Sequence, residues 1–129
     1  MRGDIKSSIH PTQSLLPATR TASANGAGVD LTNFDAACVV IDAGAWTNGT
    51  HTFEVQDSDD NSTFTAVPAA NLDGTAPVID GATDDEQIYE IGYHGTKRYL
   101  RVAVTVTGSP ATGAAYSATV IRGHGRVRP

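Results

Sequence analysis

The residue types that most often carry enzyme chemistry are present in this chain, but their spacing matches no common catalytic motif. Four histidines are spread along the sequence, at His10, His51, His94 and His124. None belongs to a His-Glu-x-x-His pair, and no serine stands in a Gly-x-Ser-x-Gly turn. The acidic residues gather in loop-like stretches rather than as a pair at strand ends, which argues against glycosidase chemistry. The sequence therefore predicts a protein that is not an enzyme and uses no cofactor.

The strongest candidate for a metal site is the acidic run Asp-Ser-Asp-Asp-Asn-Ser that begins at Asp57. Asp57, Asp59 and Asn61 match the first three ligand positions of a calcium-binding loop. The glycine of such a loop is replaced by Ser62, and its final glutamate by Pro68. The same composition is typical of an exposed turn, in which short polar side chains bond to the backbone. We expect a turn without a metal, with a looser cation site as the alternative.

Charge is divided along the chain, whose formal net charge is −5. Thirteen of the 14 acidic residues lie between residues 21 and 96, and that stretch contains no lysine or arginine. An acidic body with basic ends favours electrostatic association with another protein, unless folding interleaves the two signs. It argues against nucleic acid as the main partner, because phosphate binding needs a basic surface. The longest apolar run, residues 36–41, is far shorter than the roughly 20 residues of a membrane span.

The clearest signal for secondary structure is the stretch 97–107, Lys-Arg-Tyr-Leu-Arg-Val-Ala-Val-Thr-Val-Thr. Leu100, Val102, Val104 and Val106 alternate with mostly polar residues, so they fall on one face of a strand. Valine and threonine also suit a pleated surface. We expect a central, half-buried antiparallel strand here.

Several other stretches read as short strands separated by turns rich in Gly, Asp, Asn and Pro. Residues 36–43 are apolar on both faces, which predicts a strand covered on both sides, and Cys38 within it is expected to be a buried, inert thiol. Asn48-Gly49 between two β-prone runs predicts a two-residue hairpin. About seven or eight strands without helical periodicity predict an all-β fold, an antiparallel β-sandwich with Greek-key or jelly-roll-like connections.

The first 28 residues read as an extended N-terminal arm, because small polar residues fill them and Pro11 and Pro17 interrupt them. Such a segment cannot form a core alone, so we expect it to be held by another chain. Residues 29–122 are expected to form the sandwich, and residues 123–129 a basic C-terminal tail. Arg2 is followed by no apolar segment, so we expect no secretory signal and an origin in the cytoplasm.

Three motifs in the later part of the chain are distinctive: His-Thr-Phe-Glu-Val-Gln-Asp-Ser-Asp-Asp-Asn-Ser-Thr-Phe-Thr-Ala-Val, Gly-Tyr-His-Gly-Thr-Lys-Arg-Tyr-Leu-Arg-Val and Val-Ile-Arg-Gly-His-Gly-Arg. Together they make residues 51–126 resemble a family of small virion structural proteins of tailed bacteriophages. The resemblance does not cover the first 28 residues and transfers no catalytic residue. It implies a virion component that is made in the host cytoplasm.

Within that family the expected role is a capsid decoration, or cement, protein on the exterior of the head. Such a protein binds the major capsid protein and copies of itself, with a trimer favoured, and bridges and stabilises capsomers. We expect no nucleic acid and no membrane as partner. A head-completion, neck or tail component is the alternative, as is a carbohydrate-binding β-sandwich that stacks sugars on Trp46, Tyr89, Tyr93 and Tyr99.

The residues expected to form protein interfaces belong to two groups, the large apolar side chains of the arm and the basic face near the central strand and the tail. The first group is Ile5, Ile9, Leu15 and Leu16, and the second is Arg98, Tyr99, Arg101, Arg122, Arg126 and Arg128.

Overall fold

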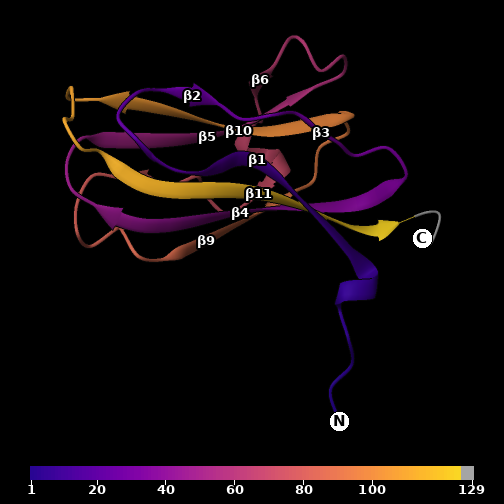
Figure 1. Ribbon diagram of the computed structural model, residues 1–129. Coiled ribbons are helices and arrows are strands. Elements are labelled where there is room, and N and C mark those ends of the chain that lie inside the picture. Colours follow the sequence, from indigo (N-terminus) through magenta and orange to yellow (C-terminus); the bar gives the residue numbers. More distant parts are fainter. Residues whose placement is uncertain (126–129) are drawn as a thin grey trace.

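The alternating stretch near Lys97 forms strand β10 (Tyr99–Thr107), which lies inside a sheet as its pattern predicts. The computed structural model describes residues 1–125 and shows two antiparallel β-sheets packed face to face (Figure 1). Leu100, Val102 and Val104 of β10 are at most 2% exposed. Their apolar faces are removed from water between the two sheets, and this burial is the main force that holds a sandwich together.

Each sheet combines strands from distant parts of the chain. The first, sheet A, has the spatial order β1 (Ile9–Arg20), β11 (Ala114–Gly125), β4 (Phe34–Trp46), β9 (Ile88–Tyr93) and β7 (Leu72–Asp73). The second, sheet B, has the order β2 (Ala24–Asn25), β10, β5 (Thr50–Ser58) and β6 (Thr65–Ala66), while β3 (Val29–Asp30) pairs with β10 and β8 (Val78–Ile79) with β5. Two short 3-10 turns are η1 (Lys6–Ser8) and η2 (Ala69–Asn71).

The predicted all-β antiparallel sandwich is confirmed. Residues 1–125 contain more strands than expected, because five of the eleven are only two residues long. Strand β11 continues through Gly125, so the predicted start of the C-terminal tail at residue 123 is wrong. The rest of that tail, with Arg126 and Arg128, lies outside the described residues.

The predicted arm over residues 1–28 is wrong for most of its length. Strand β1 pairs with β11 of the same chain, from Ile9 opposite Gly123 to Arg20 opposite Ala114. Only residues 1–8 precede the first strand, and they project from the sandwich (Figure 1). The segment has too few apolar side chains to build a core, but it completes the core that the other strands build and pairs its backbone with β11.

Ser14 joins the edge strand β1 to sheet B. Its backbone carbonyl accepts the N–H of Ala27 at 2.8 Å, and its hydroxyl donates to the Ala27 carbonyl at 2.9 Å. The same hydroxyl oxygen accepts the N–H of Val102 at 3.0 Å, while the N–H of Gly26 donates to the Val102 carbonyl at 2.8 Å. These bonds close one side of the sandwich with groups that would otherwise be buried without partners.

The predicted hairpin at Asn48-Gly49 is wrong, because β4 belongs to sheet A and β5 to sheet B. A type I′ turn needs positive φ at both central residues. Gly49 has a φ of 88°, whereas Asn48 is not among the residues with positive φ. The Asn48 side chain instead accepts the N–H groups of Gly113 at 2.7 Å and Thr112 at 3.3 Å, which fixes this crossover against the turn before β11.

Strand β4 is covered on one face only in the described chain, so the prediction of cover on both sides is wrong. Val39, Ile41 and Ala43 point into the core. Cys38 and Val40 alternate with them and lie half-buried on the outer face of sheet A. Burial raises the pKa of the Cys38 thiol, although this side chain is less buried than expected.

Candidate interaction surfaces

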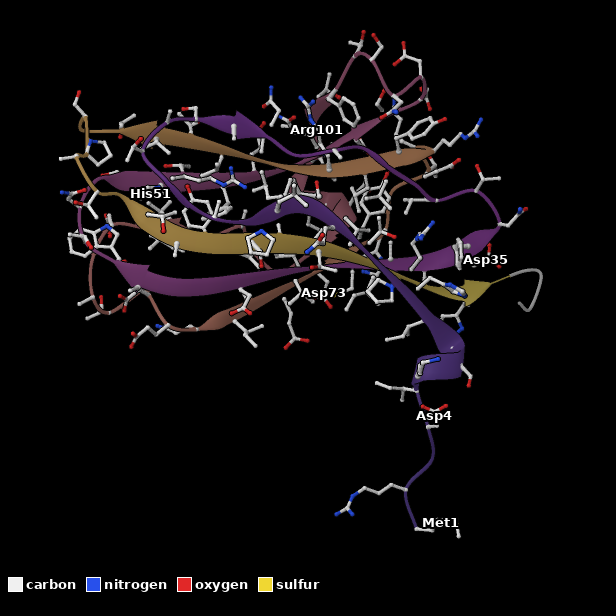
Figure 2. The ribbon with its side chains drawn as sticks, viewed as in Figure 1. Met1, Asp4, Asp35, His51, Asp73 and Arg101 are labelled. Carbon is white, nitrogen blue, oxygen red and sulfur yellow. The ribbon has the colours of Figure 1, made fainter. Side chains whose placement is uncertain are left out.

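The four fully buried polar side chains of residues 1–125, those of Ser14, His51, Asp57 and Ser58, have internal partners, whereas the buried Nε of the partly exposed Arg20 has none. His51 lies within the sandwich (Figure 2), where its Nδ1 is 2.8 Å from the Tyr116 hydroxyl and its Nε2 is 3.1 Å from the Asn48 carbonyl. A neutral imidazole satisfies both contacts when Nε2–H donates to the carbonyl and Nδ1 accepts from the hydroxyl. The hydrogen bonds of this histidine therefore connect β5 with β11 and with the chain crossover at Asn48.

A second buried pair links the two sheets at the other end. The Tyr93 hydroxyl donates to Oδ2 of Asp57 at 2.8 Å, and it accepts the N–H of Lys97 at 3.2 Å. Burial, together with the hydrogen bond to the Asp57 carboxylate, raises the pKa of Tyr93 well above its usual range. The tyrosine thus remains a neutral donor that satisfies a buried carboxylate.

The acidic run that resembles a calcium loop forms a turn held by its own backbone. Oδ1 of Asp60 accepts the N–H groups of Ser62 and Thr63, each at 2.9 Å, and the Ser58 hydroxyl at 2.8 Å. These bonds to backbone and hydroxyl lower the pKa of Asp60 to about 2. Within residues 1–125, no three His, Cys, Asp or Glu side chains are placed to hold a metal ion.

The four apolar residues expected at an interface lie in different environments. Ile5 is 71% exposed in the projecting segment, and Leu16 is 62% exposed on β1. Ile9 is half-buried where β1 begins. Leu15 is 2% exposed and belongs to the hydrophobic core, so the prediction that it forms an interface is wrong. A bulge in the β1–β11 pairing around Leu15 places two consecutive residues, Ser14 and Leu15, inside the sandwich.

Three residues of the expected basic face meet at one end of the sandwich. Arg98 donates from Nε and Nη2 to the two carboxylate oxygens of Asp30, at 3.1 and 2.9 Å, and this pairing holds the pKa of Asp30 far below its usual range. The Arg98 guanidinium also lies 5.0 Å from the centre of the Tyr99 ring. Arg122 donates to the Asp30 carbonyl at 3.0 Å and to the Thr12 hydroxyl at 2.7 Å. Sequence alone could not show that these arginines tie strands of their own chain together.

A cleft of about 540 Å³ opens at the same end. Its walls come from residues 31–37 and 95–98, together with Tyr93 and Asp59. Two of its basic side chains already have acidic partners, Lys97 with Asp59 at 3.0 Å and Arg98 with Asp30 at 2.9 Å. Among residues 1–125, the walls of the cleft therefore contribute no lysine or arginine without an acidic partner.

Arg101 lies on the outer face of sheet B, away from the core (Figure 2). Its Nε donates to Oε1 of Gln56 at 2.8 Å, and its guanidinium stacks 4.0 Å from the centre of the Phe64 ring. The expectation that this side of β10 points outward agrees with these contacts. Of the basic residues on or beside β10, Arg101 is the one that makes no salt bridge within residues 1–125.

Acidic side chains gather on and around β9 and β7 at one edge of sheet A, and in the loop before β9. This group, called the acidic side below, consists of Asp42, Asp73, Asp80, Asp84, Asp85, Glu86 and Glu90. Neither salt bridge among residues 1–125 involves any of them. A hydrogen bond shared with Asp84 raises the pKa of Asp80, because two carboxylates lie close together. The absence of Lys and Arg between residues 21 and 96 hinted at this surface, but strand order decides where it lies.

The aromatic residues considered for sugar stacking do not share one exposed face. Tyr93 is only 7% exposed and points into the core. Tyr89 donates its hydroxyl to the Asp84 carbonyl, and the Trp46 indole donates to the Gly49 carbonyl at 2.8 Å. Trp46 lies at the end of β4 where the chain crosses to β5, whereas Tyr99 begins β10 beside the opposite end of β5. A flat aromatic platform made of all four is therefore absent.

Comparisons with known proteins find a distant structural likeness and no match to a family. No protein-family model matches the chain, and no curated protein matches it. Among solved structures, the chain is similar to the crystal structure of the SPBc2 prophage-derived protein YomS, with 17% sequence identity and a TM-score of 0.45. The match covers 88% of this chain and 91% of that one. In residues 1–125 there is no helix with the length and apolar character needed to cross a membrane.

Proposed function

We propose that this chain is a non-enzymatic structural protein of a tailed-bacteriophage virion, and that it decorates the exterior of the head. In this role it binds the major capsid protein, associates with further copies of itself, and bridges and stabilises capsomers. The resemblance of residues 51–126 to small virion structural proteins supports the virion assignment. Weak contacts of each copy with several capsid subunits add up through avidity when the neighbouring sites are bound at the same time.

The observation that carries the proposal is the distribution of charge on the surface. Buried polar groups such as Ser14, His51 and Asp57 are satisfied inside the sandwich. The acidic side, in contrast, has no salt bridge within the described chain, and Arg101 stands on the opposite sheet. A β-sandwich with an acidic side on one sheet and an arginine without a salt bridge on the other suits a protein that binds several neighbours, since complementary potentials select and orient partners.

Cosedimentation with heads that lack the protein tests the role. The purified chain is expected to bind the shell in many copies, more weakly at high salt. Arg101→Glu is expected to reduce this binding without unfolding the protein, and Arg101→Lys, which keeps the charge, is the matched control. Binding that is unchanged by Arg101→Glu contradicts a role for this face, and absence of binding to heads contradicts decoration.

Location within the particle separates decoration from the neck or tail alternative. Quantitative mass spectrometry of purified virions is expected to give a copy number comparable with that of the capsid lattice, and labelled protein is expected over the whole shell. A copy number matching a single ring, with density confined to one vertex or to the tail, would instead identify a head-completion, neck or tail component.

A further inference from the structure

Residues 1–8, called the N-terminal segment below, offer a charged and apolar surface that the rest of the described chain does not use. All eight residues are exposed, and Ile5 is 71% exposed. The segment carries Arg2 and Lys6, and neither takes part in a salt bridge within residues 1–125. Its own acid, Asp4, accepts the Lys6 N–H at 2.8 Å and the Ser7 hydroxyl at 2.9 Å. The turn that Asp4 stabilises therefore carries an exposed isoleucine between two cations in the sequence.

The acidic side presents the complementary pattern. Ile88 is 63% exposed on β9, and in the strand register it lies opposite Asp42 of β4. Glu90 follows on the same face of β9, because residues two apart in a strand point the same way. An exposed isoleucine is thus flanked by carboxylates that form no salt bridge among the described residues.

We propose that the N-terminal segment of one copy binds the acidic side of a second copy. Arg2 and Lys6 face Asp42 and Glu90 in this contact, and Ile5 packs against Ile88. Opposite charges around an apolar centre match the usual arrangement of a protein interface, with a hydrophobic middle and a polar rim. This contact deepens the proposed function, because it names how copies join, but it rests on complementary surfaces and not on the capsid.

The segment of a given copy is poorly placed to reach its own acidic side. In sheet A, β1 and β9 are separated by β11 and β4, which amounts to three strand spacings or about 14 Å. The segment also leaves β1 in a direction away from the sandwich (Figure 1). A second copy therefore meets it more readily than the same chain does.

The two halves of this contact are different surfaces, so the association is heterologous. Each copy that donates its segment keeps a free acidic side, and each copy that accepts keeps a free segment. Such contacts continue into a closed ring if the rotation between copies closes, and into an open chain if it does not. The contact is also expected to weaken with salt, since exposed charges are screened beyond about 8–10 Å at moderate ionic strength.

A mixing experiment with two variants tests the proposal in the absence of capsids. The first variant removes the segment's surface by Arg2→Gln, Ile5→Ser and Lys6→Gln. The second removes the acceptor by Asp42→Asn, Ile88→Ser and Glu90→Gln. Sedimentation velocity is expected to show concentration-dependent association of the unaltered protein that decreases with salt, and loss of association for each variant alone. An equimolar mixture is expected to form a one-to-one dimer that grows no further, because only one working contact remains.

Leu16→Ser is the matched control, since Leu16 is as exposed as Ile88 but lies outside both surfaces. It is expected to associate as the unaltered protein does, and circular dichroism confirms that every variant is folded. The proposal is overturned if the unaltered protein stays monomeric, if either variant associates normally, or if the mixture stays monomeric. Because no capsid is present, failure here leaves the decoration role standing, and failure to bind heads leaves this contact standing.

Discussion

At the scale of single residues, hydrogen bonds between distant strands decide how the two sheets close. The Ser14 hydroxyl bonds to both Ala27 and Val102, and this arrangement leaves no room beside Gly26. The hydrogen bond between Tyr93 and Asp57 connects the two sheets at the opposite end of the molecule. In each case a small group of polar atoms is buried with its partners present, and loss of one partner leaves the others unsatisfied.

Replacement of Gly26 by alanine is expected to destabilise the protein by about 1–3 kcal/mol, the usual cost of overpacking. A Cβ at this position would lie 2.3 Å from the Ser14 hydroxyl and 2.5 Å from the Val102 carbonyl. Gly81→Ala is the control, because no atom lies within 4 Å of its new Cβ. Chemical denaturation measures both variants, and equal stabilities would contradict the close approach of β1 to sheet B.

Removal of the Tyr93 hydroxyl in Tyr93→Phe is expected to cost about 1–3 kcal/mol, because the buried Asp57 carboxylate loses a donor. Tyr99→Phe serves as the comparison, since no hydrogen bond of the Tyr99 hydroxyl is found among residues 1–125. Thermal unfolding of the two variants at neutral pH is the measurement. If Tyr93→Phe lowers the stability less than Tyr99→Phe does, the hydrogen bond between Tyr93 and Asp57 adds no stability.

The turn held by Asp60 predicts a specific dependence on pH. Its pKa is about 2 in the folded protein against an ordinary value of 3.8, so the folded state favours the ionised carboxylate. The resulting stabilisation is fully present above the ordinary pKa and is lost as the pH falls toward 2. Asp60→Asn keeps an acceptor oxygen but cannot titrate. The difference in unfolding free energy between the two proteins is expected to shrink between pH 4 and 2. A constant difference would show that the ionisation of Asp60 does not stabilise the fold.

At the scale of elements, β1 is the strand whose role differs most from the prediction. Two prolines and a bulge interrupt it, features that are typical of an edge strand and protect it from pairing with other chains. Its inward residue Leu15 nevertheless completes the core, whereas the next residue, Leu16, points to solvent. The strand thus belongs to the sandwich, and only residues 1–8 are free to act as an arm.

The neighbouring leucines of β1 provide a direct test of this placement. Leu15→Ala is expected to lower stability by about 2–5 kcal/mol, because it leaves a cavity in the core. Leu16→Ala is expected to change stability by less than about 0.5 kcal/mol, as at other exposed sites. Denaturant titration of both variants gives the comparison. Similar small effects would mean that β1 does not pack on the core of its own chain.

At the scale of the whole molecule, the chain combines a core closed between two sheets with an acidic side on sheet A. Strands that follow one another in sequence often lie in different sheets, as β4 and β5 do, and as β9, β10 and β11 do. Most tertiary contacts are therefore long-range, and the core depends on both ends of the chain. The acidic side, in contrast, collects residues from β4, β7, β9 and the loop before β9 without contributing to the core.

Hydrogen exchange is expected to report this organisation directly. Amides of β10, β4 and β11 should exchange slowest, because these strands are paired on both sides, and those of residues 1–8 fastest. Amides of β1 that bond to β11 should be protected well above those of residues 1–8. Equal exchange rates in β1 and in residues 1–8 would mean that β1 does not pack on its own chain, and would support the arm predicted over residues 1–28.

Local patterns predicted several features correctly. The alternation around Leu100, Val102 and Val104 identified the inward face of β10. Patterns that depend on a partner were less reliable. Asn48-Gly49 has the composition of a hairpin turn, but the strands on either side pair with β11 and β10 rather than with each other. Among the candidate arginines, Arg98 binds Asp30 and Arg122 binds Thr12, and both partners come from segments far away in the sequence.

The sequence by itself determined the class of fold, the inward face of the central strand and the acidic character of residues 21–96. These properties follow from side-chain period and composition, which are local. Tertiary structure decided that β1 completes the core, that the chain crosses between sheets at Asn48-Gly49, and that acidic residues from four elements form one side. Those outcomes depend on which strands pair across long stretches of chain, and the alternation of a strand carries no information about its partner.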